Sequence, residues 1–87
     1  MIHEEVLKKA LGNIRKDEIV NAIWECKEDE NDEKTVIVSC TERVNVGDKS
    51  FDVSLSCKTF DEEHSIICAV HACNDALLKI LQSIDII

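Results

Sequence analysis

The sequence predicts an α+β fold with the element order α-β-β-β-α, in which a three-stranded antiparallel meander has the N- and C-terminal helices packed on one face. Apolar residues recur at helical spacing near both ends of the chain, and between them two segments alternate apolar and polar residues around Gly47-Asp48. The chain has 87 residues, no proline and two glycines, a composition typical of a compact domain without linkers. We therefore expect residues 1–87 to form a single domain.

The first helix is predicted from Ile2 to Leu11. Ile2, Val6 and Ala10 fall on one face, and acidic residues occupy the first turn, where the helix dipole favours negative charge. Gly12 is a natural residue for the end of a helix.

Two periods compete between Ile19 and Lys27. Helical spacing would align Ile19, Ile23 and Cys26, whereas alternation gives a strand whose inward face is Val20, Ala22, Trp24 and Cys26. We favour the strand because β-branched and aromatic residues are frequent here and strands follow; a second helix is the alternative. The next segment, Glu28 to Lys34, is expected to be an exposed turn because it is almost entirely charged.

Thr35–Val46 and Lys49–Thr59 are predicted to form a hairpin around Gly47-Asp48, with glycine first in a type II′ turn. Pairing Val46 with Lys49 separates an apolar face from a polar one. On the apolar face the expected pairs are Val44 with Phe51, Cys40 with Leu55 and Val38 with Cys57; Arg43 meets Asp52 on the polar face, and Glu42 opposite Val53 is the exception.

The segment from Asp61 to Ile84 is the longest stretch with helical periodicity, and Asp61 or Thr59 can cap it. One face is apolar: Ile66, Val70, Cys73, Leu77, Ile80 and Ile84. The opposite face is polar but nearly uncharged, with His64, Cys68, His71, Asp75 and Gln82. This pattern indicates a helix that is covered on both sides.

Charge and cysteine content exclude several classes of function. Ten basic and eighteen acidic residues give a net charge of −8, which opposes direct binding to nucleic acid or to an anionic membrane. No segment is typical of a signal peptide or a transmembrane span. Five cysteines without zinc-finger spacing indicate a reducing, cytoplasmic setting in which thiols behave as small buried apolar groups.

The element order resembles that of the double-stranded RNA-binding domain, in topology alone. Lysines at the start of the last helix hold phosphates in that family, whereas this chain has Asp61, Glu62 and Glu63 followed by His64. Because the charge is reversed, no RNA-binding residue is carried over. Small acidic phage inhibitors, including some anti-CRISPR proteins, are similar in combining a short meander with flanking helices, although no motif assigns this chain to one of their families.

The residues His64, Cys68 and His71 are weak candidates for a metal site, since they recur along one side of a helix. The simpler interpretation is a polar helix contact surface. A thiolate at Cys68 activated by a histidine would need an oxyanion-binding loop, and no such signature is present. We therefore predict no catalytic residues, no cofactor and no enzyme activity.

Two surfaces are candidates for protein contacts. The acidic run after the first strand could imitate phosphates in a basic groove, with Glu28, Asp29, Glu30, Asp32 and Glu33 as the partner-binding residues; the plainer interpretation is a solvated loop. It lacks the glycine and terminal glutamate of a calcium-binding EF-hand. The outer face of the last helix could form a homodimer interface through Cys68, His71, Ala72 and Asp75, unless the first helix or the tail Ile84–Ile87 covers it.

The sequence thus favours a small acidic, non-enzymatic binding or inhibitor protein. We expect it to be homodimeric and cytoplasmic, and to dock on a basic, possibly nucleic-acid-binding, protein partner as phage anti-defence proteins do. One alternative is a metal- or thiol-dependent regulatory domain that uses His64, Cys68 and His71. Another is a homo-oligomer that sequesters a small ligand.

Overall fold

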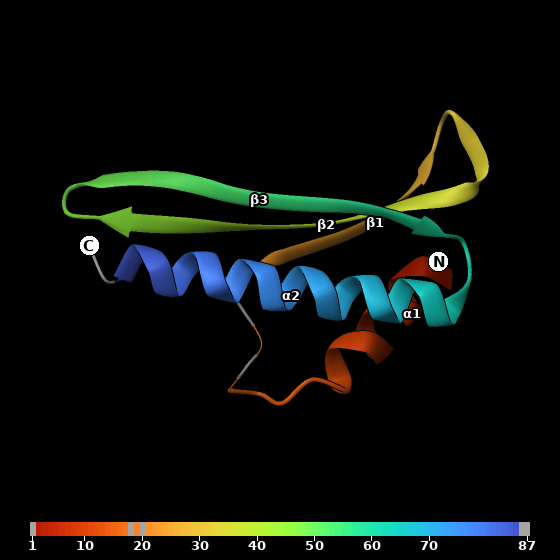
Figure 1. Cartoon of the computed structure of the whole chain (residues 1–87), viewed down its shortest axis with the longest axis horizontal. Helices are drawn as coiled ribbons and strands as arrows, with labels where there is room; N and C mark the ends of the chain where they lie inside the picture. Colours follow the sequence, from red (N-terminus) through yellow and green to blue (C-terminus); the bar gives the residue numbers. More distant parts are fainter. Residues whose placement is uncertain (1, 18, 20, 86–87) are drawn as a thin grey trace.

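A computed structural model describes residues 2–17, 19 and 21–85. The element order is α1 (Ile2–Gly12), β1 (Ile23–Asp29), β2 (Asp32–Val46), β3 (Lys49–Phe60) and α2 (Glu63–Asp85), and the three strands form one antiparallel sheet in the order β1-β2-β3 (Figure 1). The predicted α-β-β-β-α fold is confirmed.

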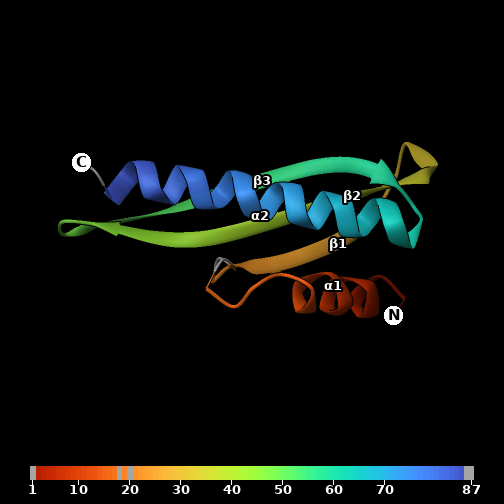
Figure 2. The same ribbon diagram turned by 60° about the horizontal axis from the view of Figure 1, so that its bottom comes forward.

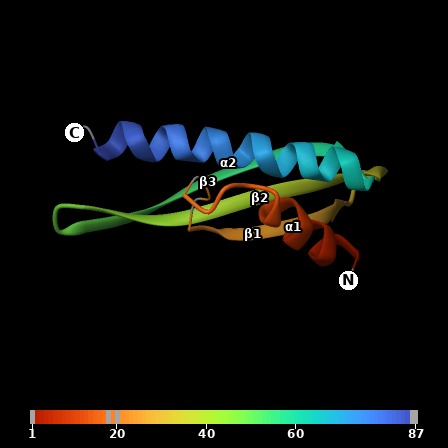
Figure 3. The same ribbon diagram turned by 90° about the horizontal axis from the view of Figure 1, so that it is seen from below.

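The two helices lie side by side on one face of the sheet, α1 over β1 and α2 over β2 and β3 (Figures 2 and 3). The helix α1 ends one residue later than predicted and buries Val6, Leu7 and Ala10. Lys9 anchors it to the start of α2 through an ion pair with Glu63 at 2.6 Å. No helix of the described residues covers the opposite face of the sheet, so that face is open.

The strand interpretation of the segment 19–27 is confirmed, although β1 begins only at Ile23; Val20 lies outside the described residues. The expected exposed turn over residues 28–34 is wrong for most of its length. β1 extends to Asp29, which pairs with Asp32 at the start of β2, so that only Glu30 and Asn31 connect the strands. The charged composition did not reveal this pairing, because strands are joined by hydrogen bonds between backbone groups and the charges of the side chains do not indicate those bonds.

The hairpin register is confirmed at every predicted pair, from Val46–Lys49 to Val38–Cys57. Gly47 has a φ of 64°, the positive value that a type II′ turn requires at its first central residue. No described residue other than glycine has a positive φ. Glu42 lies opposite Val53 on the inward face, where its Oε2 is buried without a hydrogen-bond partner.

The core has two adjoining parts. The first lies between α1, the sheet and the first half of α2, and includes the fully buried Val36, Val38 and Val70. The second lies between β2, β3 and the second half of α2, around Cys40, Cys73 and Leu77. Trp24 packs against both parts and joins them. The apolar stripe predicted for the last helix is therefore its buried face, except that Ile80 is partly exposed.

Candidate protein-interaction site

The carboxylates of the acidic run fall into two groups, and the first group holds the β1–β2 turn in shape. Asp29 is only 8% exposed; its Oδ1 accepts the backbone N–H of Asn31 at 2.9 Å. Asp32 accepts the backbone N–H of Lys34 at 3.0 Å and the hydroxyl of Thr35 at 2.9 Å. These two hydrogen bonds lower the pKa of Asp32. Asp29 and Asp32 therefore form hydrogen bonds that stabilise the turn of their own chain.

The second group, Glu28, Glu30 and Glu33, surrounds this turn at one end of the sheet, where the chain projects from the molecule (Figure 1). All three side chains are exposed, and within the described residues none forms a hydrogen bond or an ion pair. Such a group repels anions and attracts a cationic surface.

An open hollow of about 470 Å³ lies beside the turn, on the side of β3. Its lining includes Asp29, Asp32 and Lys58 as well as Phe60, whose side chain is 68% exposed. Aromatic residues are enriched at protein-binding surfaces, where an apolar centre is surrounded by a polar rim. Phe60 was not among the predicted site residues, and the predicted strand ended one residue before it, at Thr59. Continuing the confirmed register by one residue places Phe60 opposite Thr35 on the outward face, which was the available signal.

The candidate metal residues of α2 are not brought together as a set. His64 Nε2 lies 3.8 Å from Cys68 Sγ at the surface. His71 is half-buried, and its Nε2 is buried without a partner. Among the described residues, no group of three or more histidine, cysteine or acidic side chains is arranged to hold a metal ion.

The residues expected at a dimer interface occupy different environments. Cys68, Ala72 and Asp75 are exposed, whereas His71 is half-buried. His71 lies on the same flank of α2 as Ile67, one turn earlier, and Ile67 packs against the first part of the core, to which both helices and the sheet contribute. The body of the monomer thus covers this flank in part; the end of the tail, Ile86–Ile87, lies outside the described residues.

Three thiols meet inside the second part of the core. Cys73 Sγ lies 3.6 Å from Cys57 Sγ, and Cys40 is adjacent. Burial and the neighbouring thiols Cys57 and Cys40 raise the pKa of Cys73 to about 12. Burial is also the main cause that raises the pKa of Cys26 and of Cys40. The buried thiols therefore stay neutral at neutral pH, which suits core packing and not nucleophilic chemistry.

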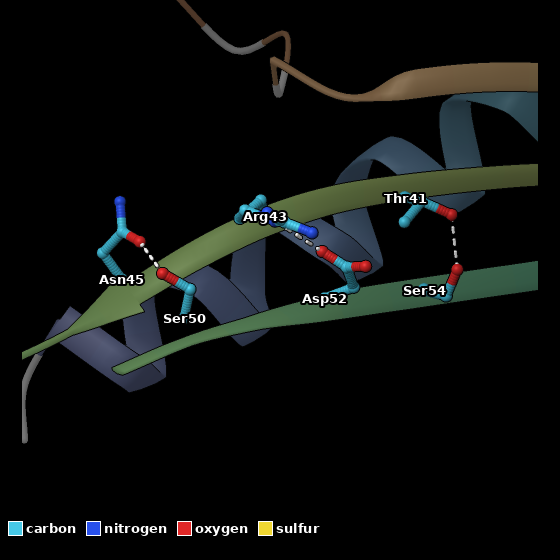
Figure 4. Close-up of polar contacts among 6 residues, drawn as sticks. All are labelled: Thr41, Arg43, Asn45, Ser50, Asp52 and Ser54. Atoms are coloured by element: carbon cyan, nitrogen blue, oxygen red, sulfur yellow. Dashed lines mark hydrogen bonds and ion pairs between the residues drawn. The ribbon is translucent and has the colours of Figure 1, made fainter. Parts of the chain in front are cut away.

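The open face of the sheet is polar near the hairpin, as the predicted register implied. Arg43 Nε donates to Asp52 Oδ1 at 3.2 Å, and the flanking pairs Thr41–Ser54 and Asn45–Ser50 are also hydrogen-bonded (Figure 4). These contacts satisfy the polar groups across β2 and β3. The acidic turn, by contrast, is a part of the described surface where several charges of one sign gather without partners.

None of the helices in the described part of the chain has the length and apolar character needed to cross a bilayer. Comparisons with protein-family models, with curated proteins and with solved structures found no match to this chain.

Proposed function

We propose that this protein is a small non-enzymatic binding protein that docks the β1–β2 turn onto a basic surface of a partner protein and inhibits that partner by occupying the surface. One observation carries the proposal. Glu28, Glu30 and Glu33 are exposed and unpaired around a turn that Asp29 and Asp32 hold in shape. The backbone that carries these charges is therefore held before a partner arrives, so less backbone entropy is lost on docking than for a flexible loop.

A basic surface fits this turn for electrostatic reasons. A groove that binds nucleic acid presents rows of Arg and Lys at the spacing of phosphates, and carboxylates can occupy the same positions. The net charge of −8 would increase the rate of approach to such a partner at low ionic strength. Phe60, beside the turn, would supply apolar contact area that charge alone lacks. The proposal includes a reducing, cytoplasmic setting, which the five free cysteines support.

The test is affinity capture from an extract of the source cells, followed by measurement of binding to the captured protein. The turn variant is Glu28→Lys, Glu30→Lys and Glu33→Lys. The control variant, Glu4→Lys, Glu5→Lys and Asp48→Lys, makes the same change of net charge at exposed positions outside the turn. We expect the turn variant to lose the partner and the control to retain it, with binding of the wild-type protein weakening as salt is added.

Retention of the partner by the turn variant at low salt would contradict the proposal. Equal loss in both variants would also contradict it, because the binding would then depend on net charge and not on the turn. Phe60→Ala separates the two contributions: it should weaken binding while leaving its salt dependence unchanged.

A further inference from the structure

We propose that β3 pairs with β3 of a second copy of the chain, antiparallel and centred on Leu55, so that one sheet runs through both copies of a homodimer. The inference goes beyond the docking function, which uses the β1–β2 turn and Phe60 at one end of the sheet. It rests on the free edge of β3, on the order of charges along that strand and on the flank of α2 above it.

The backbone of β3 has hydrogen-bonding groups on a free side. β3 is an edge strand, so one side of it pairs with β2 and the other side has no strand beside it in the described structure. Val46 and Lys49 flank a two-residue turn and so form a hydrogen-bonded pair, after which the pattern alternates along the ladder. It follows that the N–H and C=O groups directed to the free edge include those of Asp52, Ser54, Ser56 and Lys58.

The two edges of the sheet differ in how they are protected. Natural edge strands are protected by proline, charged side chains, bulges, inward charges or a covering element, and of these β3 has, between Phe51 and Thr59, only the charges on its outward face. β1 is short, its register shifts between Glu28 and Asp29, and α1 packs over it. β3 pairs with β2 from Lys49 to Phe60 without a register shift and contains no proline. Between Phe51 and Thr59 its inward face carries no charge.

The inward face of β3 is also incompletely covered. Val53, Leu55 and Cys57 are only partly buried, and Phe51 is 44% exposed. An antiparallel copy of β3 would place equivalent apolar side chains beside these and remove more apolar surface from water.

Charge order selects one register. With Leu55 on the two-fold axis, Asp52 of each copy lies opposite Lys58 of the other, while Ser54 meets Ser56 and Val53 meets Cys57. Slipping to the neighbouring registers that keep the faces matched places Asp52 opposite Ser56 or Phe60, and the opposite charges no longer meet. The centred register therefore uses the free backbone groups, the apolar row and the charges of β3 together.

The helix layer is compatible with this arrangement. Ile67 and Leu78 are on the flank of α2 that faces the rest of the core, so the other flank lies toward the free edge of β3 (Figures 2 and 3). On that flank Ala72 and Ala76 are small and exposed and Ile80 is 36% exposed, while the exposed Lys79 lies at its outer margin. Small residues allow two helices to approach closely, as the two α2 helices would across the axis. Ala72 was also expected at a dimer interface from the sequence.

The first measurement is the mass of the wild-type protein by analytical ultracentrifugation over a range of concentrations. We expect a reversible dimer; a monomer at every concentration overturns the inference. Asp52→Lys and Lys58→Asp each place like charges opposite each other twice per dimer, and each should raise the dissociation constant on the order of tenfold.

The double variant D52K/K58D is the decisive control. Within one chain it places like charges beside Arg43 and Asp29, so it cannot restore the monomer's own pairs. Between copies it restores opposite charges with reversed sign, and we expect the dimer to recover. Failure to recover in a folded double variant, verified by circular dichroism, overturns the inference.

A backbone variant tests the edge independently of charge. Ser56→Pro removes an N–H directed to the free edge and none directed to β2, so it should give a folded monomer. A dimer that persists in Ser56→Pro and in both single charge variants would overturn the inference, because its interface would lie on another surface, such as that of Cys68 and Asp75.

Discussion

Asp29 and Lys58 form an ion pair, with 3.5 Å between Oδ2 and Nζ, although β2 lies between their strands. Asp29 is nearly buried at the end of β1, whereas Lys58 is largely exposed on β3. The ion pair links the start of the acidic turn, on β1, to β3 on the other side of β2. It acts in addition to the hydrogen bond that the backbone N–H of Asn31 donates to Asp29. This ion pair distinguishes Asp29, which stabilises the fold, from the neighbouring Glu28 and Glu30, whose carboxylates are free to bind a partner.

We therefore expect Asp29→Ala to lower the free energy of unfolding by about 1–2 kcal/mol, through loss of its hydrogen bond and of the ion pair. The measurement is urea denaturation followed by circular dichroism. Glu30→Ala, in the same turn but exposed and unpaired, should change stability by less than about 0.5 kcal/mol. Equal effects of the two substitutions would show that the turn is not braced by Asp29.

The two glycines should respond in opposite ways to alanine. Gly47 has a positive φ, and a Cβ there would contact nothing within 4 Å, so any cost of Gly47→Ala comes from the backbone conformation. We expect a loss of about 1–2 kcal/mol in the free energy of unfolding. Gly12→Ala, at the end of α1 with equal space around it, should be neutral or stabilising because alanine favours a helix. Thermal denaturation of both variants checks the contrast, and a similar loss at both sites would contradict it.

The buried face of α2 can be tested with a pair of aliphatic residues on one helix. Leu77, on α2, is completely buried against β2 and β3, so Leu77→Ala should cost about 2–5 kcal/mol by leaving a cavity. Ile80 is 36% exposed, and Ile80→Ala should cost about 1 kcal/mol or less. Urea denaturation of the variants measures both. If Ile80→Ala were the more damaging, the assignment of the buried face would be wrong.

The buried thiol of Cys73 predicts a loss of stability in alkaline solution. Its pKa rises from 9.0 in the unfolded chain to about 12 in the fold, so below pH 9 it is protonated in both states and its contribution is fully present. Between these values the unfolded chain releases the proton while the folded chain retains it, and the free energy of unfolding falls as pH rises.

The measurement is the urea midpoint of the reduced protein from about pH 8 to about pH 11. Cys73→Ala should be less stable at neutral pH, because it leaves space in the core, but its stability should depend less on pH across this range. A variant whose alkaline loss equals that of the wild-type protein would contradict the assignment to Cys73.

Much of the fold followed from patterns a few residues long. The alternation along β2 and β3, with Gly47 between them, was sufficient to predict every pair of the hairpin that was specified. Side-chain direction alternates strictly along a strand and only one register separated the apolar and polar faces, so no long-range information was needed. The limits of α1 and α2 were predicted for a similar reason, since helical spacing persists over several turns.

The β1–β2 connection was not predictable in this way. The charges of Glu28 and Asp29 are typical of a turn, but their backbones pair with β2, through N–H and C=O groups that every residue other than proline has. The degree of burial of His71 was equally unpredictable from the sequence. Its position on α2 was clear from the sequence, but how far it is covered depended on how the first part of the core packs against the flank of α2 that carries Ile67.

The sequence by itself determined the order of the elements, the register of the hairpin and the acidic character of the turn, because each arises from residues close together in the chain. Only the tertiary structure decided that Asp29 reaches Lys58, that Cys57 meets Cys73 and that β3 is left with a free edge. These relations join segments that are distant in sequence, and they depend on which surfaces the helices cover once the core has closed. Local periodicity does not determine which surfaces are covered. Burying apolar area stabilises any arrangement that removes this area from water, and close packing then selects among the arrangements.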